Sequence, residues 1–304
     1  YKLMLKRYNS TKYLPDVYMT SDRIDSGYSF SETEPSVIRV PIGGFETLSL
    51  CCMKDGSTKA CVAGWGKEYE LPSMFVADPE DSSSRTIRAC FLGDSIYITN
   101  IEKTGDATAV IKSAKLSKNS DKAVCGNTDV ELNCVYLDDE PFSFEWQSAW
   151  LSFYEDDHGA LFLGDNYLTR HLTVLKTADG GVTWAKAGDD SNLKTDSWHE
   201  WVDFAKFVSD NEGMVSYSYY GHEEMCDRTF VTIDGGKTWK KLSVDYDSNT
   251  PADTPDDGCV YEATSLEVEN GVYKLTLRRY NGRINLPDVY MTSDRIDSGY
   301  KFTE

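Results

Sequence analysis

Carboxylates are the most numerous groups in this chain that could do chemistry, and many of them are neighbours in the sequence. Two carboxylates catalyse glycoside hydrolysis only when they converge at roughly 5–10 Å from different parts of a fold. Adjacent acidic residues in an acidic chain are more typical of solvated loops, and no Asp-x-Asp-x-Asp-Gly calcium loop is present. The acidic runs are Asp138-Asp139-Glu140, Asp156-Asp157, Asp189-Asp190 and Asp256-Asp257.

Metal ligands and nucleophiles are present without the spacing that their chemistry requires. His199, His222-Glu223-Glu224 and Cys226 are of ligand types, but they match no metal-binding pattern. Neither a Gly-x-Ser-x-Gly elbow nor a phosphate-binding glycine loop occurs. We therefore predict no metal site and no cofactor.

The chain has eight cysteines and no Cys-x-x-Cys pair. Bridges between Cys125 and Cys134, or between Cys226 and Cys259, would suit a secreted protein. The alternative is that these residues are small buried apolar side chains in strands, as in the run Leu48–Cys52. The sequence leaves the connectivity open.

Net charge and length exclude several classes of partner. Lysine and arginine number 31 against 50 aspartates and glutamates, a net charge of −19, which excludes nucleic acid as a partner. No apolar run approaches the ~20 residues that cross a bilayer, so we expect no membrane insertion. We expect one domain over residues 1–304. Because the chain begins at Tyr1 with no leader segment, we expect a mature or trimmed piece.

The two ends of the chain are near-identical repeats. Residues 1–32 and 273–304 agree at 24 of 32 positions, and Leu14–Tyr28 recurs unchanged as Leu286–Tyr300. Such agreement at an offset of 272 residues indicates a duplication.

A second repeat lies inside the chain, where Thr177–Trp184 (TADGGVTW) recurs 55 residues later as Thr232–Trp239 (TIDGGKTW). Short segments whose residue types alternate with a period of two, as in β-strands, separate these copies. By alignment with Ala149–Tyr154 we predict a strand over Trp201–Val208. Repeats of roughly 50–60 residues, each with about four short strands, predict an all-β fold, a β-propeller. Looser copies are Asp25–Phe30 and Asp297–Phe302, and a decayed one begins at Asp81.

The Thr-x-Asp-Gly-Gly-x-Thr-Trp motif resembles the Asp box, or BNR repeat, of sialidase-like and related propellers. The resemblance implies four-stranded antiparallel blades with each box in a turn on the rim away from the ligand. We expect the aspartates to accept hydrogen bonds within the turn, the glycines to supply positive φ, and the tryptophans to be buried. The predicted structural residues are Asp25, Gly27, Asp179, Gly181, Thr183, Trp184, Asp234, Gly236, Thr238, Trp239, Asp297 and Gly299.

The resemblance also states what a sialidase would need: an arginine triad, a tyrosine nucleophile paired with glutamate, and an acid/base aspartate. The family's Phe/Tyr-Arg-Ile-Pro motif has one approximate match, Ile38-Arg39-Val40-Pro41, which lacks the aromatic residue. Arg39 is therefore the one candidate ligand arginine, with an exposed strand residue as the alternative. The other arginines considered, at 170, 228, 278 and 279, have no matching context, and no catalytic residue is identified.

Two tryptophan pairs could stack on sugar rings. They are Trp146 with Trp150, and Trp198 with Trp201. Their equivalent positions in two repeats favour packing in the core or between blades.

The spacing of the boxes predicts the number of blades. Intervals of 56, 55 and 63 residues separate most copies, and the 98-residue gap between Asp81 and Asp179 fits two blades, with a lost box near 115–130. We predict six blades, residues 1–32 being a partial first blade and 273–304 the closing one; five or seven are alternatives. If the whole domain was duplicated in tandem, residues 1–32 are the tail of a previous copy. The ring would then have five blades, or the duplicated ends would compete for one blade position, which would permit strand-swapped self-association.

Two functions from different classes fit these observations. The first is a non-catalytic propeller, extracellular or at the cell surface, that binds a glycan or protein ligand. The second is a glycoside hydrolase of sialidase-like or xyloglucanase-like type with a diverged active site. An intracellular assembly factor is a third interpretation, which reduced cysteines would favour.

Overall fold

The computed structural model of the chain describes fifteen parts of it. They are residues 2–8, 13–20, 29–30, 36–42, 47–53, 55–76, 85–105, 108–132, 148–164, 172–188, 193, 200–219, 229–242, 259–281 and 284–303.

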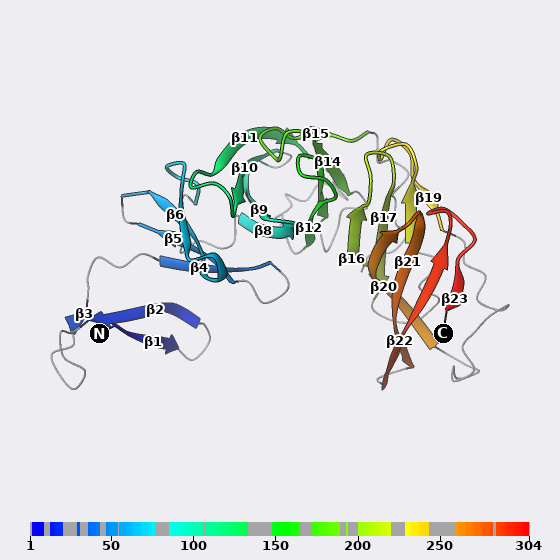
Figure 1. Cartoon of the computed structure of the whole chain (residues 1–304), viewed down its shortest axis with the longest axis horizontal. Helices are drawn as coiled ribbons and strands as arrows, with labels where there is room; N and C mark the ends of the chain where they lie inside the picture. The colour runs from blue at the N-terminus through cyan, green and yellow to red at the C-terminus, as the bar shows by residue number, and fades with distance from the viewer. Residues whose placement is uncertain are drawn as a thin grey trace, which may run out of the picture.

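The chain is an all-β propeller protein, and the predicted fold class is confirmed. In the described part of the chain the strands form five four-stranded antiparallel sheets and one three-stranded sheet, with the strands of each sheet paired in chain order. Each four-stranded meander is a propeller blade. The sheets, labelled A to F in chain order, follow one another along an arc whose two ends carry the N- and C-termini (Figure 1). No helix in the described part is long and apolar enough to cross a membrane.

The strands of the first three sheets have the following bounds. Sheet A consists of β1 (Lys2–Tyr8), β2 (Tyr13–Thr20) and β3 (Ser29–Phe30). Sheet B consists of β4 (Ser36–Pro41), β5 (Thr47–Cys52), β6 (Thr58–Val62) and β7 (Lys67–Leu71), with the short 3-10 helix η1 (Ala63–Trp65) between its last two strands. Sheet C consists of β8 (Arg85–Leu92), β9 (Ser95–Gly105), β10 (Thr108–Ser117) and β11 (Val124–Glu131).

The last three sheets repeat this order. Sheet D consists of β12 (Ser148–Phe153), β13 (Gly159–Gly164), β14 (Thr173–Thr177) and β15 (Ala185–Lys186). Sheet E consists of β16 (Glu200–Phe207), β17 (Gly213–Tyr219), β18 (Thr229–Thr232) and β19 (Lys240–Lys241), so the strand predicted over Trp201–Val208 is confirmed. Sheet F consists of β20 (Cys259–Glu269), β21 (Val272–Asn281), β22 (Ile284–Ser293) and β23 (Lys301–Thr303).

The hydrophobic core lies between successive sheets. The first strands β8, β12, β16 and β20 contact one another in turn along the inner side of the arc (Figure 1). Four buried clusters fill the four spaces from sheet B to sheet F, because alternate residues of each strand point to opposite faces. Representative pairs are Leu50 and Ile98, Ile111 and Leu161, Phe162 and Phe207, and Met214 and Leu275.

Sheet A reproduces three of the four strands of sheet F. Leu5 pairs with Val17 as Leu277 pairs with Val289, and both ladders have a register shift immediately afterwards. β3 pairs with β2 in the register in which β23 pairs with β22. The strand of sheet F without a counterpart among the described strands of sheet A is its first, β20. The duplicated ends therefore lie in separate sheets.

Candidate functional site

The two complete Thr-x-Asp-Gly-Gly-x-Thr-Trp motifs, called boxes below, form turns with the same hydrogen bonds between the third and fourth strands of sheets D and E. In sheet D the Asp179 carboxylate accepts hydrogen bonds from Thr177 Oγ1 at 2.7 Å, Thr183 N at 2.9 Å and Thr183 Oγ1 at 2.6 Å. The Gly181 amide donates to Thr177 Oγ1 at 2.9 Å, and Gly181 has a φ of 91°. A residue with a β-carbon would be strained in this conformation.

The copy in sheet E repeats these bonds. Asp234 accepts from Thr232 Oγ1 at 2.9 Å, from Thr238 N at 2.9 Å and from Thr238 Oγ1 at 2.6 Å, and Gly236 has a φ of 93°. Burial opposes ionisation of both aspartates, but the hydrogen bonds from Thr183 and Thr238 outweigh it and lower the pKa of each carboxyl. These carboxylates are ionised and engaged by their own turns, which is a structural arrangement.

Each box tryptophan is buried against the preceding sheet. The Trp184 indole donates from Nε1 to Ser113 Oγ of β10 at 2.9 Å and meets the Phe153 ring edge-on, with centroids 6.2 Å apart. Trp239 meets Phe207 in the same way at 6.0 Å. Trp239 Nε1 is buried without an acceptor among the described residues. The two box tryptophans thus differ by one hydrogen bond, which Trp184 makes through Nε1.

The predicted copy at Asp297 has a different structure. Gly299 has a φ of 77°, but the Asp297 carboxylate accepts two hydrogen bonds at 2.9 Å from the Arg295 guanidinium. In this turn Ser293 Oγ accepts a hydrogen bond from the Arg295 amide at 3.0 Å. The predicted residues Asp25 and Gly27, and the decayed copy at Asp81, lie outside the described residues.

The third-to-fourth turn of sheet C falls at residues 118–123, within the range predicted for the lost box. Ser117 Oγ accepts from the Asn119 amide at 3.3 Å, as Thr177 Oγ1 accepts from the Asp179 amide at 3.4 Å. Val124, 53% exposed, occupies the position of the box tryptophan. This turn keeps the first hydrogen bond of the box without its aromatic anchor.

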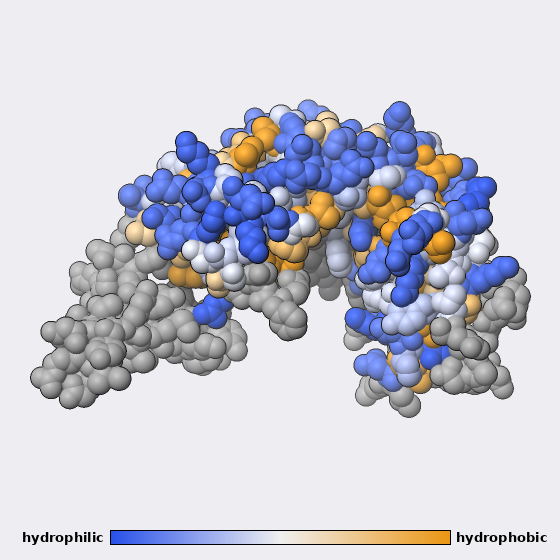
Figure 2. Space-filling view, in the orientation of Figure 1, coloured by the Kyte–Doolittle hydropathy of each residue, from blue (hydrophilic) through white to orange (hydrophobic). Residues whose placement is uncertain are grey.

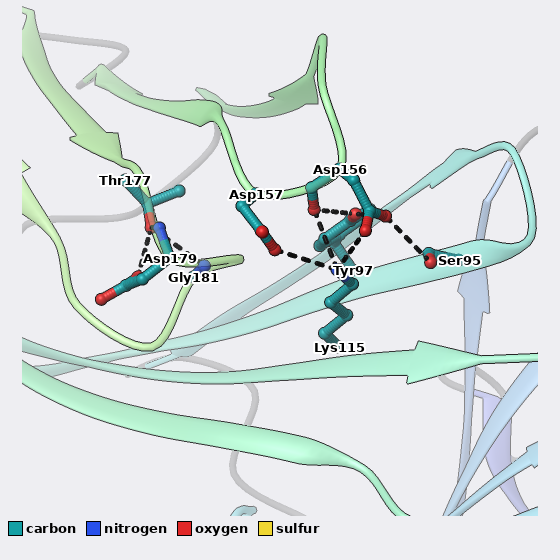
Figure 3. Close-up of polar contacts among 8 residues, drawn as sticks. All are labelled: Ser95, Tyr97, Lys115, Asp156, Asp157, Thr177, Asp179 and Gly181. Carbon is teal, nitrogen blue, oxygen red and sulfur yellow. Dashed lines mark hydrogen bonds and ion pairs between the residues drawn. The ribbon is translucent and has the colours of Figure 1, made fainter. Parts of the chain in front are cut away.

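Polar clusters that join neighbouring sheets are the main site feature that the sequence did not reveal. The hairpin between β12 and β13 places Asp156 and Asp157 against sheet C (Figure 3). Lys115 Nζ of β10 lies 2.9 Å from Asp156 Oδ2 and 3.0 Å from Asp157 Oδ1. The Tyr97 hydroxyl also donates to Asp156 Oδ1 at 3.0 Å. Figure 3 places this cluster beside the box turn of Asp179.

The electrostatics of this cluster favour the ion pairs. Burial disfavours the Lys115 ammonium, but its bonds to Asp156 and Asp157 outweigh that effect and raise its pKa. The hydrogen bond from Lys115 lowers the pKa of Asp156. Burial and the Asp156 carboxylate raise the pKa of Tyr97 to about 12, so the phenol remains a donor at neutral pH.

A second cluster joins sheets D and E in the same place one sheet further on. Asp210, in the hairpin between β16 and β17, accepts from the Tyr154 hydroxyl at 2.9 Å and faces His158 Nδ1 at 2.7 Å. Lys176 Nζ donates to the Asp210 carbonyl. At the next interface the Tyr273 hydroxyl donates to Glu212 Oε1 at 2.7 Å. Acidic hairpins bonded to neighbouring sheets therefore recur at three interfaces.

The His158–Asp210 pair makes a pH-dependent contribution to stability. The hydrogen bond to Asp210 raises the pKa of His158, so the contribution is complete below the ordinary value near 6.5 and is lost as the pH rises through the folded value. We expect His158→Ala to lower the free energy of unfolding by a few tenths of a kcal/mol more at about pH 5.5 than at about pH 8.5. Urea denaturation at both pH values measures the difference.

Tyr154→Phe is the matched control, since it removes the other hydrogen bond to Asp210 without removing a group that titrates in this range. Its effect is expected to be equal at the two pH values. A His158→Ala effect that is also equal at both would contradict the pairing.

The three described arginines among those considered from the sequence lie on two different sheets. Arg39 is exposed on β4 of sheet B, whereas Arg278 and Arg279 lie on β21 of sheet F, across the arc in Figure 1. Arg278 lies 3.6 Å from Glu262, and the buried Arg279 donates from Nε to the Pro287 carbonyl at 2.8 Å. Arg170 and Arg228 lie outside the described residues. The structure does not bring the three described arginines together.

Of the four candidate tryptophans, the structure describes the side chain of Trp150. It is half-buried, donates from Nε1 to the Val202 carbonyl of β16 at 3.0 Å, and meets Phe204 edge-on at 6.3 Å. Trp150 thus joins sheets D and E. Trp146 and Trp198 lie outside the described residues, as does the side chain of Trp201.

An aromatic pair that the sequence analysis did not single out lies at one end of sheets B and C. Trp65 of η1 and the 46% exposed Phe91 of β8 have ring centroids 6.5 Å apart. The buried Tyr69 supports Trp65 edge-on at 6.3 Å. We call the rings of Trp65 and Phe91 the Trp65–Phe91 platform.

Two polar contacts in sheets B and C involve residues close in the chain to the two rings: Lys67 follows Trp65 by two residues and Asp94 follows Phe91 by three. Lys67 Nζ lies 2.8 Å from Asp121 Oδ1, and Asn119 Nδ2 donates to Asp94 Oδ2 at 3.4 Å. These four groups come from β7, the turn after β8 and the turn after β10, which meet at this end of the two sheets. Figure 2 shows a mainly hydrophilic surface with hydrophobic patches between polar side chains. The described residues contain no group of three or more His, Cys, Asp or Glu side chains placed to hold a metal ion.

No family model matches the chain, and no curated protein matches it. Among solved structures it is similar to the GH74 xyloglucanase from Xanthomonas campestris, at 13% identity and a TM-score of 0.36, over 88% of this chain and 39% of that one. It is also similar to the fucose-specific lectin from Aleuria aurantia (11%, TM-score 0.39, 95% and 86%). A third is the Trypanosoma rangeli sialidase (13%, TM-score 0.37, 96% and 51%). These similarities are weak, and the propeller fold is evident from the chain's own sheets.

Proposed function

We propose that residues 1–304 form one Asp-box propeller domain, extracellular or at the cell surface, that binds a glycan without catalysis. The carrying observation is the Trp65–Phe91 platform, which offers exposed aromatic surface beside two carboxylates, an amide and an ammonium. Sugars present both C–H faces that lie on aromatic rings and hydroxyls that pair with such groups. A protein ligand with an exposed apolar side chain is the alternative occupant.

The hydrogen bonds and ion pairs of four acidic side chains support the non-catalytic part of the proposal. Asp179 and Asp234 are held by their turns, and Asp156 and Asp210 are bonded to neighbouring sheets. General acid catalysis needs a carboxyl whose pKa is raised towards neutrality, whereas the pKa of each of these four is lowered. The glycoside hydrolase remains the alternative that the experiment addresses.

A glycan array combined with hydrolysis assays on fluorogenic sialosides and β-glucosides tests the proposal. We expect binding without turnover, and we expect Trp65→Ala to weaken binding at least about tenfold, as loss of a central aromatic contact does. Tyr290→Ala is the matched control, because Tyr290 is an exposed aromatic residue on sheet F, away from the platform. Turnover that Arg39→Ala abolishes would overturn the proposal in favour of a hydrolase.

Self-association by strand exchange is a second proposal, which the shared register of sheets A and F favours. The described strands β1 to β3 pair with one another in the register in which β21 to β23 pair, and sheet F has one further strand, β20, which pairs with β21. In a second copy of the chain, β1 could pair with β20 in place of β21. Because residues 1–9 repeat most of the sequence of β21 from Tyr273 onward, the exchange would retain most of the β20–β21 ladder, although the pair Glu269–Val272 has no counterpart.

Analytical ultracentrifugation over a range of concentrations tests the exchange. We expect a dimer that Leu5→Glu abolishes while the far-ultraviolet circular dichroism is unchanged. Leu277→Glu, at the equivalent register position, should instead destabilise the fold, since Leu277 is buried between sheets E and F. A full chain that is monomeric at every concentration would contradict this proposal and leave glycan binding unaffected.

A further inference from the structure

Two thiols on sheet B lie in contact and are not needed by the proposed binding function. Cys51 Sγ and Cys61 Sγ are 3.5 Å apart on the neighbouring strands β5 and β6. In the ladder Cys51 faces Lys59 and Cys61 faces Ser49, so the two cysteines are diagonal neighbours on one face. Diagonal positions on adjacent strands are within reach of each other.

Cys51 and Cys61 are more exposed than the residues next to them in their strands. Leu50, Cys52, Ala60 and Val62 are buried in the core between sheets B and C, whereas Cys51 and Cys61 are only half-buried on the opposite face. Strand alternation produces this difference, since successive side chains point to opposite faces. A small soluble oxidant can therefore reach the pair from solvent.

We infer that Cys51 and Cys61 form a reversible redox pair that a low-molecular-weight disulfide, such as oxidised glutathione, converts into an intramolecular disulfide. The distance between Cys51 Sγ and Cys61 Sγ falls from 3.5 Å to the S–S bond length of about 2.05 Å when each sulfur moves by about 0.7 Å. A movement of this size is within the range of side-chain rotation. The bond would brace the second and third strands of sheet B.

The chemistry proceeds in two exchange steps. The Cys51 thiolate attacks one sulfur of oxidised glutathione, which forms a mixed disulfide and releases one glutathione thiolate. The Cys61 thiolate then attacks Cys51 Sγ and releases the second glutathione. Two protein thiols are oxidised, one disulfide is reduced to two thiols, and the two protein protons end on the departing glutathiones.

The environment of Cys61 favours this order. Burial and the contact with Cys51 raise the pKa of Cys61 to about 12, so Cys61 is the protonated partner in the reduced pair. In the mixed disulfide the Cys51 contribution to the raised Cys61 pKa is removed while that of burial remains, and the 3.5 Å separation of the two sulfurs in the reduced pair places Cys61 where it can attack Cys51 Sγ. What distinguishes Cys51 and Cys61 among the described thiols is their contact at 3.5 Å, and Cys52, next to Cys51 on the same strand, is buried on the core face.

Mass spectrometry of the whole chain equilibrated at graded ratios of oxidised to reduced glutathione tests the inference. After alkylation of the remaining thiols, trypsin cuts at Arg39, Lys54, Lys59 and Lys67, so Cys51 and Cys61 fall on the separate peptides 40–54 and 60–67. We expect a linked pair of these peptides, two hydrogen atoms lighter than their sum, that increases with the oxidised fraction and disappears on reduction.

Three variants make the result specific. Cys51→Ser should abolish the link, and Cys52→Ala, on the same peptide, should retain it. Cys61→Ser should leave Cys51 as a mixed disulfide with glutathione, which would accumulate more than in the unmodified chain because the resolving thiol is absent. The inference is overturned if the link survives in Cys51→Ser, or if no linked peptide forms in oxidised glutathione alone.

Discussion

Gly126→Ala is expected to lower the free energy of unfolding by about 3 kcal/mol, the upper range for overpacking, because rigid backbone lies where its β-carbon would go. Gly126 is on β11 of sheet C, and an added β-carbon would overlap the carbonyl oxygen and Cα of Val182 in the box turn of sheet D. At Gly126 the fourth strand of one sheet thus touches the next sheet's box through backbone atoms, and the Thr128 hydroxyl of the same strand accepts a hydrogen bond from the Trp184 amide at 3.3 Å. Relief requires that β11 or the box turn move away.

The same close approach of a glycine to the next sheet's box recurs between sheets D and E, so the prediction can be tested at a second position. A β-carbon at Gly188, just after β15, would lie 2.6 Å from Lys237 Cα in the box turn of sheet E. We expect a similar loss for Gly188→Ala. Urea denaturation followed by tryptophan fluorescence measures both.

Gly105→Ala is the control for the intrinsic effect of alanine in a strand. Its β-carbon would meet only the side chain of Thr108, which can rotate away. We expect a change below about 1 kcal/mol. If Gly126→Ala cost no more than Gly105→Ala, the close approach of the box to β11 would be refuted.

Replacing the box tryptophans is expected to have the largest effect, about 4 kcal/mol for either Trp184→Ala or Trp239→Ala, since each leaves a large cavity between two sheets. The phenylalanine variants separate packing from hydrogen bonding. Trp184→Phe removes the bond to Ser113 at 2.9 Å and should cost about 2 kcal/mol. Trp239→Phe removes a buried N–H that has no acceptor among the described residues, and should cost clearly less.

Chemical denaturation of the four variants, with Ser113→Ala and the double variant Trp184→Phe/Ser113→Ala, completes a double-mutant cycle. We expect a coupling of about 1 kcal/mol between Trp184 and Ser113. Equal losses for Trp184→Phe and Trp239→Phe would show that the indole hydrogen bond contributes nothing.

The box turns were predictable because their interactions are local. Thr177, Asp179, Gly181 and Thr183 bond to one another within four residues, so the motif specifies the turn wherever the chain carries it. The structure of the Asp297 turn was not predictable from the aspartate and glycine alone. Arg295, two residues earlier, offers that carboxylate a closer charged partner than the turn amides.

The clusters between sheets had no local signal. Tyr97 and Asp156 are 59 residues apart, and Tyr154 and Asp210 are 56 apart. Their acidic residues appeared in the sequence only as solvated runs and a recurring glycine turn. The Trp65–Phe91 platform was missed for the same reason, because its two rings come from different sheets.

The amino-acid sequence by itself determined the all-β class, the repeat length and the two box turns, since these depend on the pattern of residue types and on contacts within a few residues. The tertiary structure decided which carboxylates are neutralised and by what, which tryptophans join sheets, and which thiols lie in contact. The physical reason is that neighbouring sheets are brought together by the burial of apolar faces, and that burial sets the partners of every polar group at their edges. The −19 charge, part of which is bound in structural ion pairs, is one example.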